Sequence, residues 1–336
     1  MFSNSLVQAL QQQVVGQQYS ISALARAVTL ATLGLVQRRR PLAVLLLLGQ
    51  SGSGKNHVAR SFARLALGDE RGIIHIDCQR LTREGDPLAD LHRQLIDECL
   101  RVTTVSTSTA STFSIILLDR IDEAPASLRD SLASEIERGE IVTSGSSFPL
   151  DNCFVLLTAS LSKRKADQLI GRTIGFFREG EPGNELSDGH LVALEEMDQM
   201  FGIRLVSNID EIIILDRPNE QNVIQLFERR LSEIEQLLAR CSIGFMIDAD
   251  AKTFLIRRVI EDLTHGLRQL NRILRNHLEF PIADLILSAQ LTPGTTVVVK
   301  HEPPRGFLNF QILIPWLSAG EPALLRPQTL RAVSIG

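Results

Sequence analysis

The residues with the clearest chemistry lie in the segment GQSGSGKN, residues 49–56. Gly49, Gly54 and Lys55 have the spacing of a phosphate-binding loop, in which glycines let successive backbone amides turn toward phosphate oxygens. Lys55 would reach the terminal phosphates, and the helix that begins near Asn56 would add its positive end. The sequence therefore predicts a phosphate site formed by Gly49, Gly52, Ser53, Gly54, Lys55 and Asn56.

A metal site is predicted next to this loop. The residue after Lys55 is usually Ser or Thr, whose hydroxyl binds magnesium, but here it is Asn56. A carboxamide oxygen can also face a hard cation, so we expect binding with an altered metal affinity. The apolar run FSIILLD ends at Asp119 in a Walker B arrangement, which makes Asp119 the second candidate metal ligand.

The position after Asp119 predicts impaired hydrolysis. A glutamate would normally stand there and orient the attacking water, but the residue is Arg120, and a guanidinium cannot act as a base at neutral pH. Asp122 or Glu123 could take that role. The interpretation that we favour is that these two acids occupy a first helical turn and complement the helix dipole.

These residues require a parallel sheet to position them. Apolar runs at 44–48, 73–76, 113–118, 153–157 and 211–215 predict buried strands, and helical periodicity between them, as in 20–36 and 127–138, predicts a doubly wound α/β fold. From Asn219 the pattern is helical, with further helices expected at 249–261 and 266–278 and short strands at 296–299 and 308–313. We expect a large nucleotide-binding domain over 1–217, a small helical lid domain over 218–313 and a tail over 314–336. The Ser/Thr-rich stretch 103–112 and the Gly- and acid-rich stretch 178–189 are expected to be surface loops.

Composition narrows the class of protein. The chain has 336 residues and a net charge of −4, so no overall positive field attracts nucleic acid. Its four cysteines form no CxxC pair, which argues against a zinc site. The start of the chain does not resemble a signal peptide, and no apolar run reaches the roughly 18 residues that cross a bilayer. A cytoplasmic location is expected.

At this point the chain resembles a known family, the Clp chaperone type of AAA+ ATPase, and in particular the second AAA+ module of such chains. The resemblance covers residues 14–313. It rests on VVGQ (14–17), the phosphate loop, IILLDRIDEA (115–124), the stretch 137–160, SNIDEIIIL (207–215), GLRQLNRIL (266–274) and TPGTTVVV (292–299). It implies ATP and Mg²⁺ as ligands, adenine near Val15 and Gly16, Arg268 as the sensor 2 arginine, and assembly into a homo- or hetero-oligomer of AAA+ subunits.

Three positions depart from the family's pattern. The resemblance places sensor 1, normally Asn, at Ser160, the arginine finger at Asn208, and the catalytic glutamate at Arg120. The interval 77–112, where the family has an aromatic pore loop, contains no Tyr, Trp or Phe. The stretch GKNHVA (54–59) is similar to the phosphate loop of torsins, a divergent branch that also lacks the pore-loop aromatic and the arginine finger. We interpret these torsin-like features as parallel divergence.

Three functions remain open from the sequence. The first is an ATP-binding protein with degenerate hydrolysis motifs that acts as a nucleotide-dependent oligomeric scaffold or regulator. The second is an ATPase or chaperone that a partner subunit completes by supplying an arginine. The third is a docking module for a ClpP-like peptidase, because Ile174, Gly175 and Phe176 match a tripeptide that docks related unfoldases on that peptidase.

Overall fold

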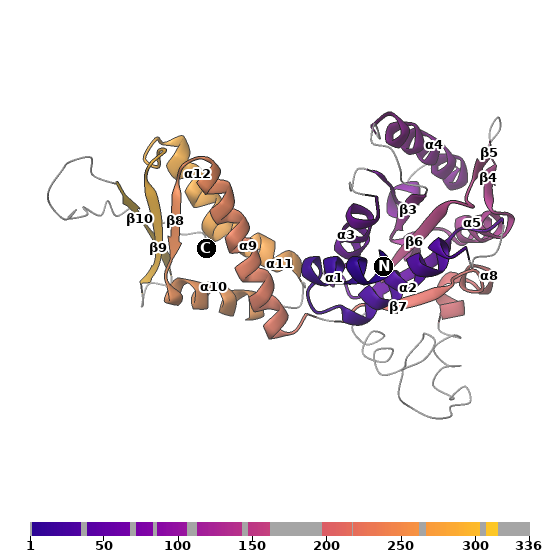
Figure 1. The fold of residues 1–336 in the computed structure, drawn as a ribbon, viewed down its shortest axis with the longest axis horizontal. Coiled ribbons are helices and arrows are strands. Elements are labelled where there is room, and N and C mark those ends of the chain that lie inside the picture. Colours follow the sequence, from indigo (N-terminus) through magenta and orange to yellow (C-terminus); the bar gives the residue numbers. More distant parts are fainter. Residues whose placement is uncertain are drawn as a thin grey trace, which may run out of the picture. The chain divides into compact units, whose positions relative to one another are not determined.

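The computed structural model describes residues 2–34, 39–67, 72–82, 86–105, 113–142, 147–161, 197–216, 218–261, 267–302 and 307–314. The chain divides into two compact units, Met1–Arg217 and Pro218–Gly336. Each unit has its own hydrophobic core and is described by itself (Figure 1).

Unit 1 is built on a five-stranded parallel sheet with the order β2-β3-β6-β1-β7. The interior strand β1 is buried at all seven positions, as expected for a strand covered on both faces. The expected α/β class is confirmed. The strands are β1 (Ala43–Gly49), β2 (Ile73–Asp77), β3 (Ser114–Asp119), β6 (Cys153–Ser160) and β7 (Glu211–Ile214).

Alternate residues of the strands point to two separate cores. Val44, Leu46 and Leu48 of β1 pack in the core that also holds α4 (Pro87–Val105) and α5 (Ala126–Arg138). The intervening residues Ala43, Leu45 and Leu47 pack in the core with α1 (Phe2–Gln13), α2 (Gln18–Thr32) and α3 (Lys55–Leu67). The sheet is therefore a middle layer between two layers of helices, with the loops after β1, β2 and β3 at one edge.

Short elements complete unit 1. Two 3-10 turns follow the sheet strands directly, η2 (Cys78–Thr82) after β2 and η3 (Ile121–Glu123) just after β3. A hairpin joins β4 (Glu140–Val142) to β5 (Ser147–Pro149), and α8 (Ile203–Val206) precedes β7. These turns begin where the parallel strands end, so they determine the position of the polar residues at that edge.

Unit 2 combines helices with a three-stranded sheet of order β10-β9-β8. The helical part comprises α9 (Glu220–Arg240), α10 (Ala249–Glu261), α11 (Leu267–Leu274), the π-helical turn η5 (Arg275–Glu279) and α12 (Phe280–Leu287). The strands are β8 (Gly244–Ile247), β9 (Thr296–Glu302) and β10 (Phe307–Leu313), with β9 parallel to β8 and antiparallel to β10. The side chain of Asn219 accepts a hydrogen bond from the Asn222 amide at 2.8 Å and caps α9.

Two expectations about elements need correction. Residues 103–105 were expected in a surface loop but form the end of α4. Strand β8 was not expected, since Gly244–Ile247 is short and its pairing with β9 comes from a distant part of the chain. The rest of 103–112, and all of 178–189 and 174–177, lie outside the described residues.

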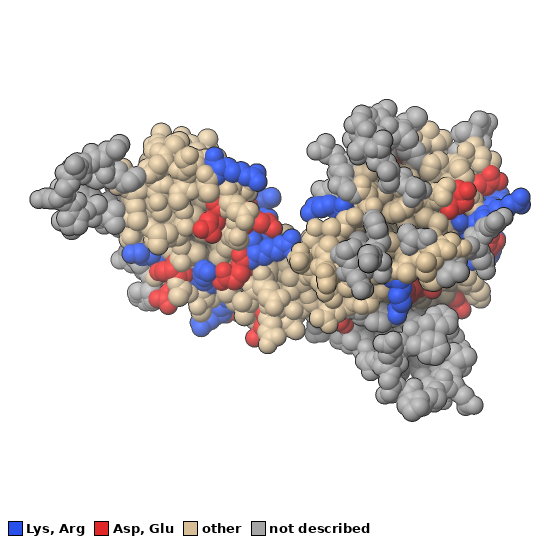
Figure 2. Space-filling model, in the orientation of Figure 1, with Lys and Arg blue, Asp and Glu red and all other residues tan. Residues whose placement is uncertain are grey.

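On the face in Figure 2, acidic and basic side chains of the described residues are intermixed on both units. No described helix is long and apolar enough to cross a membrane.

Candidate functional site

The loop between β1 and α3 has the backbone that the motif requires. Gly52 and Gly54 adopt positive φ angles of 83° and 99°, which residues with a Cβ rarely adopt. A Cβ on Gly49 would lie 2.6 Å from the Ser53 hydroxyl oxygen, so only glycine fits where β1 enters the loop. The six sequence-predicted loop residues are thus brought into one turn at the N-terminus of α3.

Lys55 is buried and its ammonium group points back along the loop. Its Nζ donates hydrogen bonds to the carbonyl oxygens of Gly49 at 2.9 Å and Gln50 at 3.0 Å. These contacts hold a positive charge beside the start of α3, where a helix dipole also favours anions. The arrangement is chemically suited to phosphate oxygens.

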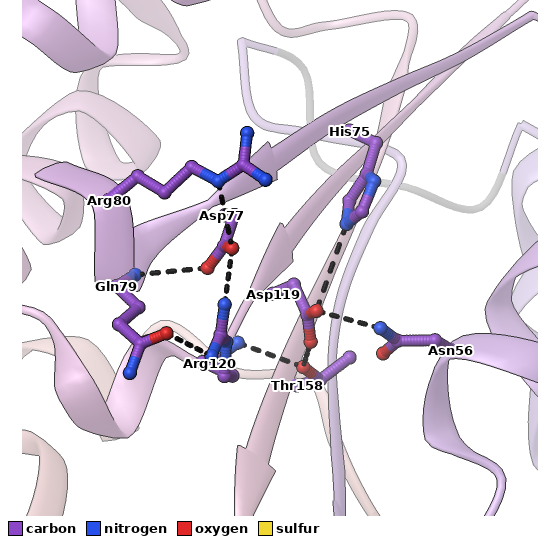
Figure 3. Close-up of polar contacts among 8 residues, drawn as sticks. All are labelled: Asn56, His75, Asp77, Gln79, Arg80, Asp119, Arg120 and Thr158. Carbon is purple, nitrogen blue, oxygen red and sulfur yellow. Dashed lines mark hydrogen bonds and ion pairs between the residues drawn. The ribbon is translucent and has the colours of Figure 1, made fainter. Parts of the chain in front are cut away.

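Asp119 and Asn56 lie side by side at the ends of β3 and the loop (Figure 3). The Asn56 amide Nδ2 donates to Asp119 Oδ2 at 2.7 Å, and the Thr158 hydroxyl donates to Asp119 Oδ1. Burial opposes ionisation of Asp119, but contacts from His75, Thr158 and Asn56 outweigh it and hold the pKa of this carboxyl well below its usual range. Asp119 is therefore a carboxylate at neutral pH.

The donor set fits a divalent cation. An ionised carboxylate is a standard oxygen ligand of hard cations. Because Asn56 uses its amide nitrogen on Asp119, its carbonyl oxygen remains the atom of that side chain that can coordinate a metal. One buried nitrogen beside them, Nε2 of His75, has no hydrogen-bond partner. Asn56 and Asp119 are the residues that would hold the cation.

Arg120 turns away from this carboxylate. Its backbone is left-handed, with φ 62° and ψ 51°, and its amide donates to the Thr158 hydroxyl oxygen at 3.0 Å. The guanidinium donates to the Asp77 carboxylate and to the Gln79 side-chain oxygen (Figure 3). Asp77 is the last residue of β2, and Gln79 lies in the turn η2 that follows. Burial works to lower the pKa of Arg120, but the contacts with Asp77 outweigh it and raise that pKa, so Arg120 is a fixed cation.

Asp122 is a second acid near the phosphate loop, within the field of Lys55. Burial raises its pKa, while backbone hydrogen bonds from its own amide and from Ser160 and the charge of Lys55 oppose that rise. Its Oδ1 is buried without a hydrogen-bond partner. Ser160, the sensor 1 candidate, lies at the end of β6 opposite Gly49 of β1. The structure thus brings Lys55, Asp122 and Ser160 together.

Asn208, the candidate finger position, is buried inside unit 1. Its amide donates to the Arg204 carbonyl oxygen at 2.8 Å and to Glu137 Oε1 at 3.1 Å. Arg40 donates to the Asn208 backbone oxygen at 3.1 Å and to its side-chain oxygen at 3.3 Å. Three of these four contacts engage the side chain, so Asn208 has a buried structural environment.

The expected adenine segment lies between α1 and α2. Gly16 there has a φ of 74°, and Gln17, which is buried, exchanges two hydrogen bonds with the backbone of Asp216 at 2.9 and 3.1 Å. These bonds fix Val15 and Gly16 near the end of β7. Arg268, the sensor 2 candidate, is an exposed residue of α11 in unit 2.

Sequence reasoning missed four residues of this site, His75, Asp77, Gln79 and Thr158. His75 is a polar residue inside the apolar strand IIHID, a pattern that signals a side chain with a polar environment. Asp77 is an acid at the end of a parallel strand, as Asp119 is, and the two are paired in register. Gln79 and Thr158 carried no such signal.

Comparison with known proteins identifies relatives of both units. Residues 218–299 match the family described as "C-terminal, D2-small domain, of ClpB protein". The chain is 26% identical to the chaperone protein ClpB of Aquifex aeolicus over 304 residues, which covers 87% of this chain and 29% of that protein. It is 23% identical to ClpB of Pseudomonas putida over 304 residues, with 87% and 33% covered.

A third relative carries a different name. The "ATP-dependent Clp protease ATP-binding subunit ClpC" of Staphylococcus aureus is 23% identical over 310 residues, which covers 89% of this chain and 36% of ClpC. The chain spans about a third of the length of these curated relatives. Together with the parallel sheet of unit 1 and the small domain that matches in unit 2, these similarities support a divergent protein of the Clp type of AAA+ proteins.

Proposed function

We propose that this protein binds ATP with a divalent cation, hydrolyses it very slowly or not at all, and acts as a nucleotide-dependent oligomeric scaffold or regulator. Lys55 and the amides of residues 52–56 would bind the phosphates, and Asn56 and Asp119 would hold the cation. The relative ClpC is named as an ATP-binding subunit, which supports nucleotide as the ligand.

The observation that carries the proposal is the orientation of Arg120. Where a glutamate would orient water, a guanidinium is held by Asp77 and Gln79 and cannot accept a proton. General base catalysis is worth about 10²–10⁴ in rate, so its loss slows hydrolysis strongly. Asp122 is a poor replacement, because its carboxylate already accepts backbone hydrogen bonds from its own amide and from Ser160 and faces the charge of Lys55.

The environment of Asn208 supports the same proposal. An arginine finger contributes roughly three to five orders of magnitude in rate in the systems where it is known. Asn208 carries no charge, is buried, and is fully engaged with Arg40, Arg204 and Glu137. A subunit of this kind would give a neighbour no cation from that position. The role of ATP would then be to stabilise an assembly.

The test compares the purified protein with its Lys55→Ala variant. Binding of a fluorescent ATP analogue, phosphate release, and molar mass with and without ATP are measured on both. We expect Lys55-dependent binding, an ATP-dependent increase in mass, and phosphate release equal to that of the variant. Clear Lys55-dependent phosphate release would refute the proposal and make Asp122 the candidate base, and release only in a mixture with another AAA+ subunit would favour an enzyme completed in trans.

A further inference from the structure

His75 is the feature of the site that the proposed function does not use. It lies within β2, and its imidazole points across the edge of the sheet toward Asp119 (Figure 3). Its Nε2 is buried and has no hydrogen-bond partner, although the side chain as a whole is 29% exposed. When protonated, the imidazole forms a long ion pair with that carboxylate, marked by a dashed line in Figure 3, but it makes no hydrogen bond there.

The spacing of these two atoms bears on whether both could bind one cation. Nε2 of His75 is 3.8 Å from Oδ2 of Asp119, which is too long for a hydrogen bond. Two ligands on one cation with bonds of about 2.1 Å are about 3.0 Å apart when adjacent and about 4.2 Å apart when opposite. The observed separation lies between these values. A small movement of either side chain would therefore bring both within bonding distance of one metal ion.

The ligand types decide which metal. Magnesium takes oxygen ligands almost exclusively, whereas imidazole nitrogen is a good ligand for divalent first-row transition metals. Asn56 supplies a carboxamide in place of the hydroxyl that usually binds magnesium, so the oxygen ligation of the hard ion is altered at the same site. The set of Asp119, Asn56 and His75 is thus mixed oxygen and nitrogen.

We propose that His75 is a metal ligand, and that the cation bound here with nucleotide is a divalent transition metal, of which Mn²⁺ is the probe, in preference to Mg²⁺. This inference rests on the proposed nucleotide binding. Manganese accepts the same octahedral geometry and the same phosphate oxygens as magnesium, and it also accepts the imidazole. The residue that selects the metal is therefore on β2, outside both nucleotide motifs.

The first experiment measures the affinity of the full chain for methylanthraniloyl-ATP with Mg²⁺ and with Mn²⁺. The wild type is compared with His75→Gln, with His301→Gln as a histidine control in unit 2, and with Lys55→Ala as the blank. In the wild type and in the His301→Gln control, we expect the nucleotide to bind at least about tenfold more tightly with Mn²⁺ than with Mg²⁺. In His75→Gln, the ratio of the two affinities should be near one. Equal ratios in the wild type and His75→Gln would overturn the inference. Binding with neither metal would refute the nucleotide proposal as well.

A second measurement needs no variant. If His75→Gln also loses binding with Mg²⁺, the wild-type complex with Mn²⁺ and ADP decides the question. Its electron spin-echo spectrum should show modulation from a directly coordinated imidazole nitrogen, and this modulation should change in protein labelled with ¹⁵N-histidine. A spectrum without nitrogen modulation would overturn the inference, even if nucleotide and Mn²⁺ bind tightly.

Discussion

Arg120 combines two features that oppose each other energetically. A left-handed backbone costs a residue with a Cβ about 1–2 kcal/mol. Charge-assisted hydrogen bonds to Asp77 and Gln79 offset this cost, but the Arg120 side chain is 31% exposed, so solvent weakens them. The φ angle of 62° is maintained because the amide of Arg120 is also fixed to Thr158. Arg120 is thus strained and anchored at the same time.

The strain can be measured with two substitutions. Arg120→Ala and Arg120→Gly both remove the guanidinium, but only glycine relieves the left-handed backbone. We expect Arg120→Gly to be more stable than Arg120→Ala by about 0.5–1 kcal/mol, after allowance for the greater flexibility of glycine in the unfolded chain. Urea unfolding monitored by circular dichroism measures the difference. Equal stability of the two variants would mean that the backbone relaxes once the side chain is removed.

Sequence reasoning found the residues of this site that belong to local motifs. Asn56 and Asp119 were singled out by spacing alone, and the structure places them in contact at 2.7 Å. The partners of Arg120 were missed because Asp77 and Gln79 lie about forty positions earlier in the chain, on a strand whose register no local pattern specifies. Residue types predict chemistry, whereas contacts between neighbouring strands depend on the fold.

Elements of unit 2 meet at a titratable contact. Arg258 of α10 donates to Nε2 of His277 in the π-helical turn η5 at 3.0 Å, and the ring of Phe254 packs edge-on against the imidazole. Burial and the charge of Arg258 lower the pKa of His277 below 6.5. Only a neutral imidazole can accept a hydrogen bond from the guanidinium. The contact between α10 and η5 therefore requires an uncharged His277.

This requirement predicts how the stability of unit 2 depends on pH. The unfolded chain binds a proton on His277 near about pH 6.5 and the folded chain only at lower pH, so protons favour unfolding in that window. The free energy of unfolding of unit 2 should fall as the pH decreases from about 7.5 to about 5.5. In His277→Gln that dependence should be smaller. The urea midpoint at both pH values measures it, and an unchanged slope in the variant would show that another group is responsible.

Helices and strands could be predicted where the sequence pattern within the element itself indicates them. The buried run of β1 and the helical periodicity of α5 and α9 identified those elements directly. β8 was missed because it has four residues and depends on its neighbour β9, and the end of α4 was misassigned because Ser and Thr there favour loops locally. For β8, pairing with β9 outweighs the weak local preference.

At the scale of the whole molecule, the residues predicted to bind nucleotide belong to both units. The phosphate loop, Asp119 and Gln17 belong to unit 1, whereas Arg268 belongs to unit 2. If ATP contacts only unit 1, ATP binding should stabilise unit 1 and should not depend on residues of unit 2. If Arg268 reads the nucleotide, binding links them, and the affinity depends on a residue outside the unit that holds the phosphates.

Arg268→Ala distinguishes these cases. A charge-assisted hydrogen bond to phosphate contributes about 1.5–3 kcal/mol, so its loss should weaken ATP binding by about tenfold or more. ATP stabilises a protein by about 2.7 kcal/mol at a hundred times its dissociation constant, so the thermal shift of unit 1 at a fixed ATP concentration should shrink in this variant. The thermal shift is taken relative to the same variant without ATP, and replacement of Arg257, an exposed arginine of α10, by Ala should leave the full shift of the wild type. A full thermal shift in Arg268→Ala would confine nucleotide binding to unit 1, and unit 2 would then serve assembly alone.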